Sequence, residues 1–443
     1  MAEDSQRTSD DKELSKENET VVQRILELNL SEPTELPPAI KTLKLELDSF
    51  FEARDVAKTQ IESFEEYNDV MEIKVKKAAS VFEELENAAL EQNKELYWQL
   101  RGKLFAGCDC KKFTEEGIRS LAIAVKLNPS SVWSWNLLGQ CYYTLNNIEM
   151  AIKCFTNALQ VAPDLKSLIN LSIAIRRQPN RTPQNIQDSL TYAQEAIRLN
   201  SHSHTAWMVL GTAHLTSFFG PQRSNVVTLK KALKAYELAN HLAPGDFEVC
   251  CNLSVTLRYI GKYEEALKTL KSCTTTVLID QAKILEEYNK LKDWLLNLSR
   301  LVVKRGKLRT SKLANFAKIA GESSKKLEPQ TADSSDGNVK QFNHGVVIFS
   351  VPSTGPFPLA VGLLGADSLI QVVTIFNVVI GKAFKVGTVL SYPQESTVNP
   401  LQMEIDDQPV DFNNIPIFNP SDLLLNGKKI SPTSLSYSCV HLV

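Results

Sequence analysis

The spacing of hydrophobic residues divides the chain into a long first part and a short last part. From residue 39 to about residue 320, apolar residues recur every three or four positions, which places them on one face of an α-helix. After residue 340 they form short β-branched runs such as VVIFSV and TVLSY, bounded by Gly, Pro, Asn or Asp, as in strands. The pattern predicts a mainly α chain that ends in a small β-domain.

One hydrophobic pattern repeats within the helical part. Its clearest copy runs from Trp135 to Pro163 in the order Trp-x2-Leu-Gly-x2-Tyr, then Ala, Phe, Ala and Pro, which is the tetratricopeptide pattern. Looser copies begin at Trp98, Leu168, Trp207 and Leu253. These five copies predict five helical pairs. Because no pair can bury its apolar face alone, the pairs are expected to stack into a superhelix with a concave groove.

The segments around the repeats are assigned from their composition. Amphipathic stretches before and after the repeats should cap the superhelix, and polar tracts have the composition of tails or linkers. The predicted layout is a disordered acidic tail (1–30), N-terminal capping helices (39–94), tetratricopeptide repeats (95–278), a capping helix with a basic patch (279–320), a linker (321–340), an OB-like β-barrel (341–430) and a tail (431–443).

The β-domain is expected to be a body separate from the superhelix. Its five or six short strands suit a partly open Greek-key barrel of the OB type. Such barrels often bind single-stranded nucleic acid through aromatic side chains on a basic face, but these strands carry mainly aliphatic residues. We therefore expect the barrel to have a structural or protein-docking role.

Composition excludes several classes of function. The chain has 49 Lys and Arg against 51 Asp and Glu, so any affinity for nucleic acid must come from a local patch. Its eight cysteines include no Cys-x-x-Cys pair, which predicts packed, reduced thiols rather than a zinc or redox site. A polar, acidic start and the lack of 18 consecutive apolar residues predict a protein that stays inside the cell.

An enzyme is not expected. The sequence contains no GxxxxGK[ST], GxGxxG, HExxH or GxSxG motif, and its six histidines are scattered. His202 and His204 lie in a turn between repeats, where solvated side chains are far more common than metal ligands. We predict no catalytic residue, no metal site and no cofactor.

The concave groove is the expected binding surface. In the first helix of a repeat, residues one, five and eight places after the Trp-like position should face the groove. The predicted peptide-binding residues at or beside such positions are Asn136, Gln140, Tyr143, Arg176, Glu248, Asn252 and Arg258. Both signs of charge occur among them, which suits a short ligand that carries both charges. A clamp for C-terminal carboxylates is disfavoured, because Gln99 with Lys103 and Asn136 with Gln140 do not have the Lys-x3-Asn spacing.

A dense basic run follows the last predicted capping helix. We predict phosphate contacts, in particular with ribosomal RNA, from Lys304, Arg305, Lys307, Arg309 and Lys312. The competing interpretation is a helix C-terminus whose dipole favours cations, which would explain two or three of them. No base-reading motif accompanies the run, so recognition of shape and charge is expected.

The segments LRGKLF, KLNPSSVWSWNLLGQCYY, SLINLSIAIRR, RGKLRTSKL, PFPLAVGLL and LLLNGKKI resemble the tetratricopeptide repeat protein 5 family, also called Strap, as a distant ortholog would. The resemblance implies a ribosome-docked adaptor that recognises the Met-Arg-Glu start of nascent tubulin and, with an mRNA-decay adaptor, triggers decay of tubulin mRNA. It equally implies a nuclear stress-responsive cofactor of a histone acetyltransferase and a tumour-suppressor transcription factor. Cytoplasmic and nuclear localisation are both expected, and neither role is catalytic.

A Met-Arg-Glu ligand assigns roles within the groove. Arg176 is the choice for the glutamate, because its planar fork can make two parallel bonds to a carboxylate. The resemblance supports Arg176, since the family's Asn-Leu-Ser-x-x-x-Arg segment is kept from Asn170 to Arg176. Glu248 is the choice for the arginine of the ligand, with Asn252 and Arg258 assisting.

Overall fold

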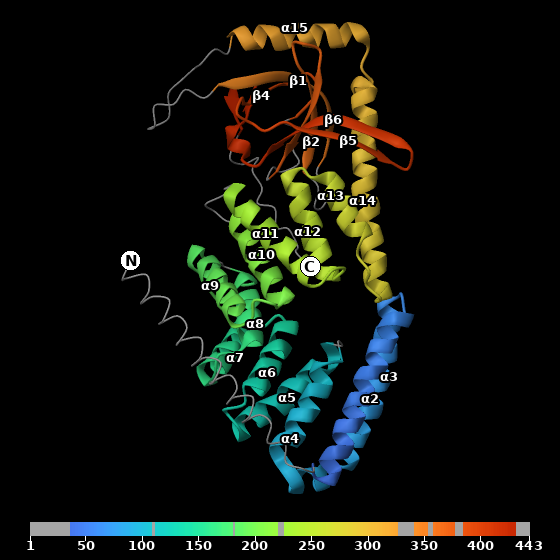
Figure 1. Cartoon of the computed structure of the whole chain (residues 1–443), viewed down its shortest axis with the longest axis vertical. Helices are drawn as coiled ribbons and strands as arrows, with labels where there is room; N and C mark the ends of the chain where they lie inside the picture. Colours follow the sequence, from blue (N-terminus) through green and yellow to red (C-terminus); the bar gives the residue numbers. More distant parts are fainter. Residues whose placement is uncertain are drawn as a thin grey trace, which may run out of the picture.

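The structure is a computed structural model that describes residues 36–108, 111–179, 182–219, 226–326, 341–352, 358–376 and 384–430. Figure 1 shows a curved stack of helices that carries a β-sheet at one end. Both predicted tails, residues 1–30 and 431–443, lie outside the described residues.

In the described residues, the repeats are preceded by α2 (Pro38–Gln60), α3 (Phe64–Glu84) and the first half of α4 (Glu86–Ala106). Leu43, Met71 and Phe82 from α2 and α3 form a buried core with Tyr97 of α4. α4 is broken at Asn93, whose φ of -159° and ψ of 95° are not helical. The Asn93 side chain accepts a hydrogen bond from the Leu96 amide at 3.0 Å and restarts the helix, as an N-cap does. The second half of α4 therefore serves as the first helix of the first repeat.

Five helical pairs follow, as the sequence pattern predicts. α4 pairs with α5, and the other four pairs are α6 with α7, α8 with α9, α10 with α11 and α12 with α13. Their bounds are α5 (Lys111–Leu127), α6 (Val132–Thr144), α7 (Ile148–Val161), α8 (Leu165–Arg176), α9 (Pro183–Leu199), α10 (His204–Phe218), α11 (Val226–Leu242), α12 (Phe247–Ile260) and α13 (Tyr263–Lys271).

The sequence explains where these helices begin and how closely they pack. The first helices α6, α8, α10 and α12 start at Ser131, Asp164, Ser203 and Asp246, each of which accepts a hydrogen bond from the amide three residues later. Within the pairs, a Cβ at Gly139 would overlap the ring of Phe155, and a Cβ at Gly211 would come within 2.9 Å of Tyr236. The two glycines of the repeat pattern are thus required for close helix contact.

After the repeats, α14 (Leu278–Val303) runs back along the stack, from the N-terminal helices to the β-sheet (Figure 1). Its start packs through Ile279 against the core of α2–α4, and its later half buries Trp294 and Leu298 against the last repeats and the sheet. A second helix, α15 (Thr310–Lys326), follows a short turn. It extends six residues into the segment predicted as a linker, and residues 327–340 lie outside the described part.

The described residues of the β-domain form six strands of five or more residues and two short ones: β1 (Phe342–Val351), β2 (Leu359–Leu364), β3 (Ile370–Ile375), β4 (Val389–Pro393), β5 (Asn399–Ile405), β6 (Gln408–Ile417), β7 (Leu424–Leu425) and β8 (Lys428–Lys429). The strand order is β5-β6-β3-β2-β1-β4-β7-β8. β1 pairs with both β2 and β4 and is bulged between Val347 and Phe349, while β3 and β6 are parallel. The order is therefore not that of a simple meander.

The expected separation of the barrel from the superhelix is wrong for the described residues. The Tyr259 ring of α12 lies 4.6 Å from that of Phe376, and the rings of Phe218 and Phe418 are 5.7 Å apart. Val346 and Ile348 of β1 share one core with the repeats and α15, whereas Val347, on the opposite face, belongs to the core inside the barrel. Each face of β1 is apolar, so the outer face needs helices to cover it.

Candidate functional site

The predicted groove residues differ sharply in exposure. On α6, Gln140 is exposed and Tyr143 is half-buried. Glu248, at the start of α12, is also exposed. The other four are buried: Asn136, Arg176, Asn252 and Arg258. Helical periodicity gave the face on which these residues lie, but it did not show which neighbouring helix covers them.

Asn136, a predicted ligand contact, joins two repeats. Its Nδ2 donates to Oδ2 of Asp164 at 2.9 Å, and its Oδ1 accepts from the hydroxyl of Ser167 at 2.9 Å. Both partners lie at the start of α8. The amide is therefore used on both sides to hold α6 against α8.

Arg176 is buried between α8 and α9, with 8% of its surface exposed. Its Nη1 donates to the hydroxyls of Ser172 at 2.8 Å and Ser189 at 2.9 Å. These two hydroxyls orient the guanidinium. The next residue, Arg177, is exposed, and its guanidinium lies 4.8 Å from the ring centroid of Tyr143.

Arg258, predicted to assist in ligand binding, connects α12 to α14. It is 3% exposed, and its Nη1 lies 3.4 Å from Oε2 of Glu287. Burial lowers the pKa of Arg258, and the carboxylate of Glu287 opposes that shift. Asn252, 2% exposed, lies in the same helix. A guanidinium already paired with a carboxylate is a poor site for a second one.

Glu248 belongs to an acidic cluster, which we define as Asp246, Glu248 and Asp280. The Glu248 side chain reaches the surface, yet the surrounding protein excludes enough water to raise the pKa of its carboxyl. Asp246 and Asp280 raise this pKa further, and His204 opposes them. His204 Nε2 lies 4.0 Å from Oδ2 of Asp246. Crowded carboxylates favour a cation among them, so this end of α12 suits a ligand guanidinium.

The five predicted phosphate-binding cations lie on a turn and the start of the next helix. Lys304 follows α14, Arg305 and Lys307 belong to a short 3-10 turn, and Arg309 and Lys312 lie at the start of α15. All five are exposed, and we call them the basic turn. A helix dipole favours cations at a C-terminus and disfavours them at an N-terminus. The dipole therefore does not explain Arg309 and Lys312.

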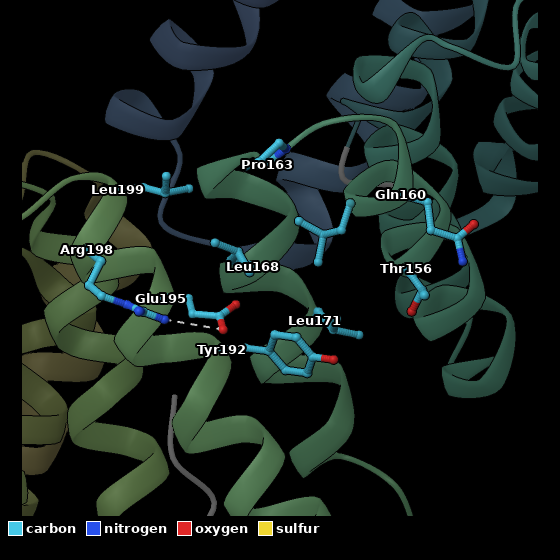
Figure 2. Close-up of a pocket in the computed structure, with 10 residues that line it drawn as sticks. Thr156, Gln160, Pro163, Leu168, Leu171, Tyr192, Glu195, Arg198 and Leu199 are labelled. Atoms are coloured by element: carbon cyan, nitrogen blue, oxygen red, sulfur yellow. Dashed lines mark ion pairs between the residues drawn. The ribbon is translucent and has the colours of Figure 1, made fainter. Parts of the chain in front are cut away.

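A pocket of about 510 Å³ lies away from these residues, between α7, α8 and α9 (Figure 2). Leu168 and Leu171 of α8 line it together with Tyr192 of α9. Glu195 and Arg198, also on α9, form an ion pair of 3.4 Å at this pocket. None of the predicted groove residues lines it.

The described cysteines are packed thiols. Six cysteines are described, and none forms a disulfide. Burial raises the pKa of Cys141 and Cys154 to about 12, so both stay protonated as packed thiols. In the part of the chain that the structure describes, no group of three His, Cys, Asp or Glu residues is placed to hold a metal ion. None of the described helices is long and apolar enough to span a bilayer.

Comparison with known proteins supports the two-part architecture. A model of the tetratricopeptide repeat protein 5 OB fold domain matches residues 334–439, and tetratricopeptide repeat models match residues 132–165 and 247–276. The fold prediction, a tetratricopeptide superhelix followed by an OB-like barrel, is thereby confirmed. Tetratricopeptide repeat protein 5 of Homo sapiens is 23% identical, covering 92% of this chain and 98% of the human protein. The Mus musculus protein is 24% identical over 89% of this chain and 92% of its own length.

Solved tetratricopeptide structures resemble part of this chain at low similarity. The crystal structure of YrrB, a TPR protein with an unusual peptide-binding site, is 20% identical over 44% of this chain and 96% of that chain, with a TM-score of 0.31. A likeness this low carries no conclusion about the ligand.

Proposed function

The chain belongs to the tetratricopeptide repeat protein 5 family, and from this premise we propose that it is a non-catalytic adaptor in tubulin autoregulation. In this role it docks on ribosomes, binds the nascent Met-Arg-Glu start of tubulin in the repeat groove and, through an mRNA-decay adaptor, triggers decay of the translated message. The three matched family models describe repeats and an OB fold, and no catalytic family is among them.

The acidic cluster is the observation that carries this proposal. Burial raises the pKa of Glu248 most, and repulsion from Asp246 and Asp280 raises it further; a ligand arginine placed beside Glu248 would relieve that repulsion. Arg176 supplies the opposite charge, and its hydroxyl partners Ser172 and Ser189 hold it in one orientation before a ligand arrives. A fixed guanidinium loses less conformational entropy when it binds a carboxylate. Together the two sites accept a peptide with one cation and one carboxylate.

The basic turn supports ribosome docking. Its five cations are exposed within nine residues of sequence, and no acid among the described residues is within ion-pair distance of them. Lysine and arginine side chains of this kind contact phosphates of folded RNA without reading bases. The basic turn and the groove lie on one chain, so an adaptor docked on a ribosome could hold the groove near an emerging peptide.

Peptide binding tests the groove assignment. Wild-type protein should bind a Met-Arg-Glu peptide more tightly than the charge-swapped Met-Glu-Arg peptide, and Arg176→Ala should lower the affinity more than tenfold, since truncating one partner of a desolvated charge pair costs about 2–5 kcal/mol. Arg176→Lys should restore only part of it. Arg177→Ala, which removes the neighbouring exposed arginine, is the matched control. Equal affinity of wild type for both peptides would exclude the assignment.

Crosslinking to translating ribosomes separates this role from the nuclear one. An autoregulation adaptor should crosslink to ribosomes that translate tubulin more than to ribosomes that translate an unrelated message. A cofactor of a histone acetyltransferase and a tumour-suppressor transcription factor would show no such preference. The basic turn favours the cytoplasmic role, although localisation in both cytoplasm and nucleus is compatible with the proposal.

A further inference from the structure

The centre of the basic turn is pressed against the barrel. Gly306 has a φ of +64°, and a Cβ added to it would overlap the carbonyl oxygen of Ile348 and lie 3.1 Å from its carbonyl carbon. Ile348 belongs to β1, so the contact joins the turn to the first strand of the barrel. Only glycine meets both conditions, because other residues rarely adopt this φ and none lacks the Cβ.

The residues on either side of Gly306 also have left-handed backbones. The φ values of Arg305 and Lys307 are 47° and 59°. Two hydrogen bonds hold the turn, from the Lys307 amide to the Lys304 carbonyl at 2.8 Å and from the Leu308 amide to the Arg305 carbonyl at 3.3 Å. Such backbones persist only where their surroundings fix them, and they concentrate at functional sites.

The barrel also holds the helix that carries the remaining cations. Leu313 and Phe316 of α15 are buried in the core that includes Val346 and Ile348 of β1. Lys312 Nζ lies 5.5 Å from the ring centroid of Phe316. Phe316 is one of the side chains that anchor α15 to the barrel. The barrel thus fixes both halves of the basic turn.

We propose that the barrel is the platform that positions the basic turn for the phosphate backbone of folded RNA, and that Gly306 is the positioning residue. This inference rests on the proposed ribosome contact and adds a role for the barrel to it. Arg305 and Lys307 flank Gly306, so a shift of the turn away from Ile348 would move both cations without removing either. Recognition by shape requires several cations at fixed spacing, whereas binding to a flexible polyanion requires only their charge.

Two ligands separate position from charge. In the full chain, Gly306→Ala should lower affinity for purified ribosomes roughly tenfold, the effect of losing about one charge-assisted contact, and change affinity for heparin less than about twofold. Arg305→Ala, Lys307→Ala and Arg309→Ala combined should lower both affinities. Gly245→Ala is the matched control. Gly245 has a φ of +83°, and a Cβ added to it would overlap Thr274. Both residues are far from the basic turn in sequence, so Gly245→Ala should leave both affinities unchanged.

Each other outcome is decisive. Unchanged ribosome binding by Gly306→Ala, or an equal loss for heparin and ribosomes, overturns the positioning role. If the triple variant keeps wild-type ribosome affinity, the proposed RNA contact itself fails. Should Gly306→Ala not fold, Gly306→Asn accepts the left-handed φ but retains the clash with Ile348. Hydrogen exchange of the wild type supplies a second measurement: amides 307 and 308 should be protected, and exchange at the rate of an open chain overturns the proposal.

Discussion

The basic turn and the acidic cluster are both charged surfaces, but the chain builds them in opposite ways. Every cation of the basic turn comes from residues 304–312, and all are exposed. The acidic cluster combines Asp246 and Glu248 at the start of α12 with Asp280 of α14, beside His204 of α10. A charged surface whose residues are contiguous can be identified from the sequence alone. A surface assembled from several helices can be identified only in the folded structure.

The environment of each surface sets which solution condition should affect it. Exposed cations keep their charge throughout the neutral range, and salt screens their attraction to phosphates. The surrounding protein shields the Glu248 carboxyl from water, and Asp246 and Asp280 add repulsion, so its pKa rises. Ribosome binding should therefore respond to salt, and peptide binding to pH.

Neutralising the basic turn should have the largest effect. Arg305→Ala, Lys307→Ala and Arg309→Ala combined should weaken ribosome binding roughly a hundredfold at physiological salt, because each lost phosphate contact reduces the salt slope by about 0.7. Ribosome pelleting over a series of salt concentrations measures both quantities. Alanine at Lys230, Lys231 and Lys234, three exposed cations of α11, makes the same change in net charge. If this control variant loses as much affinity, the contact depends on net charge alone.

Removing the acid at the groove should separate function from stability. Glu248→Gln should lower affinity for the Met-Arg-Glu peptide more than tenfold. It should also raise the Tm at pH 7, because the raised pKa shows that the folded protein disfavours the Glu248 carboxylate. Peptide titration and thermal unfolding of one preparation test both effects. Glu264→Gln, on the exposed face of α13, removes one acid that pairs with Lys268 and should change neither quantity in this way.

A higher affinity with Glu248→Gln, or a lower Tm together with unchanged affinity, would contradict the assignment. The first result would mean that the ligand avoids negative charge at this position. The second would mean that the Glu248 carboxylate stabilises the helix start, as acids in a first turn often do.

The sequence predicted features whose causes are local. The spacing of Trp135, Leu138 and Gly139 indicates which face of their helix is packed. Ser or Asp at a helix start indicates the cap. The sequence did not indicate the partners of Asn136 and Arg258, because Asp164 and Glu287 are 28 and 29 residues away. Asp280 was missed for the same reason: nothing near it in sequence indicates Glu248. The docking of the barrel through Tyr259 and Phe376 likewise depends on a contact between distant segments.

Lowering the pH should weaken peptide binding while leaving ribosome binding unchanged. Because the pKa of Glu248 lies above the ordinary 4.5, its carboxylate is lost at a higher pH than that of a solvated glutamate. Peptide affinity should thus fall as pH drops towards this raised pKa, while the fold becomes more stable as Glu248 takes up its proton. Peptide titrations between about pH 4.5 and pH 7.5 measure the first effect, and Glu248→Gln should flatten the curve. His204→Gln controls for the imidazole. A curve that Glu248→Gln leaves unchanged would assign the dependence to another group.

The smallest expected effect comes from a cation of the barrel itself. Lys385 is exposed and lies two residues before Gly387. A Cβ added to Gly387 would lie 3.5 Å from the Phe316 ring, and Lys312 lies over the same ring. If the barrel and the basic turn present one surface to RNA, Lys385 extends that surface. Lys385→Ala should then reduce the salt slope of ribosome binding by about 0.7, the share of a single contact. Lys429→Ala is the matched control, since Lys429 is exposed on β8 at the edge of the sheet order, whereas α15 packs against β1. Equal slopes for wild type and Lys385→Ala would confine the contact to residues 304–312, and the barrel would then position the cations without contributing one.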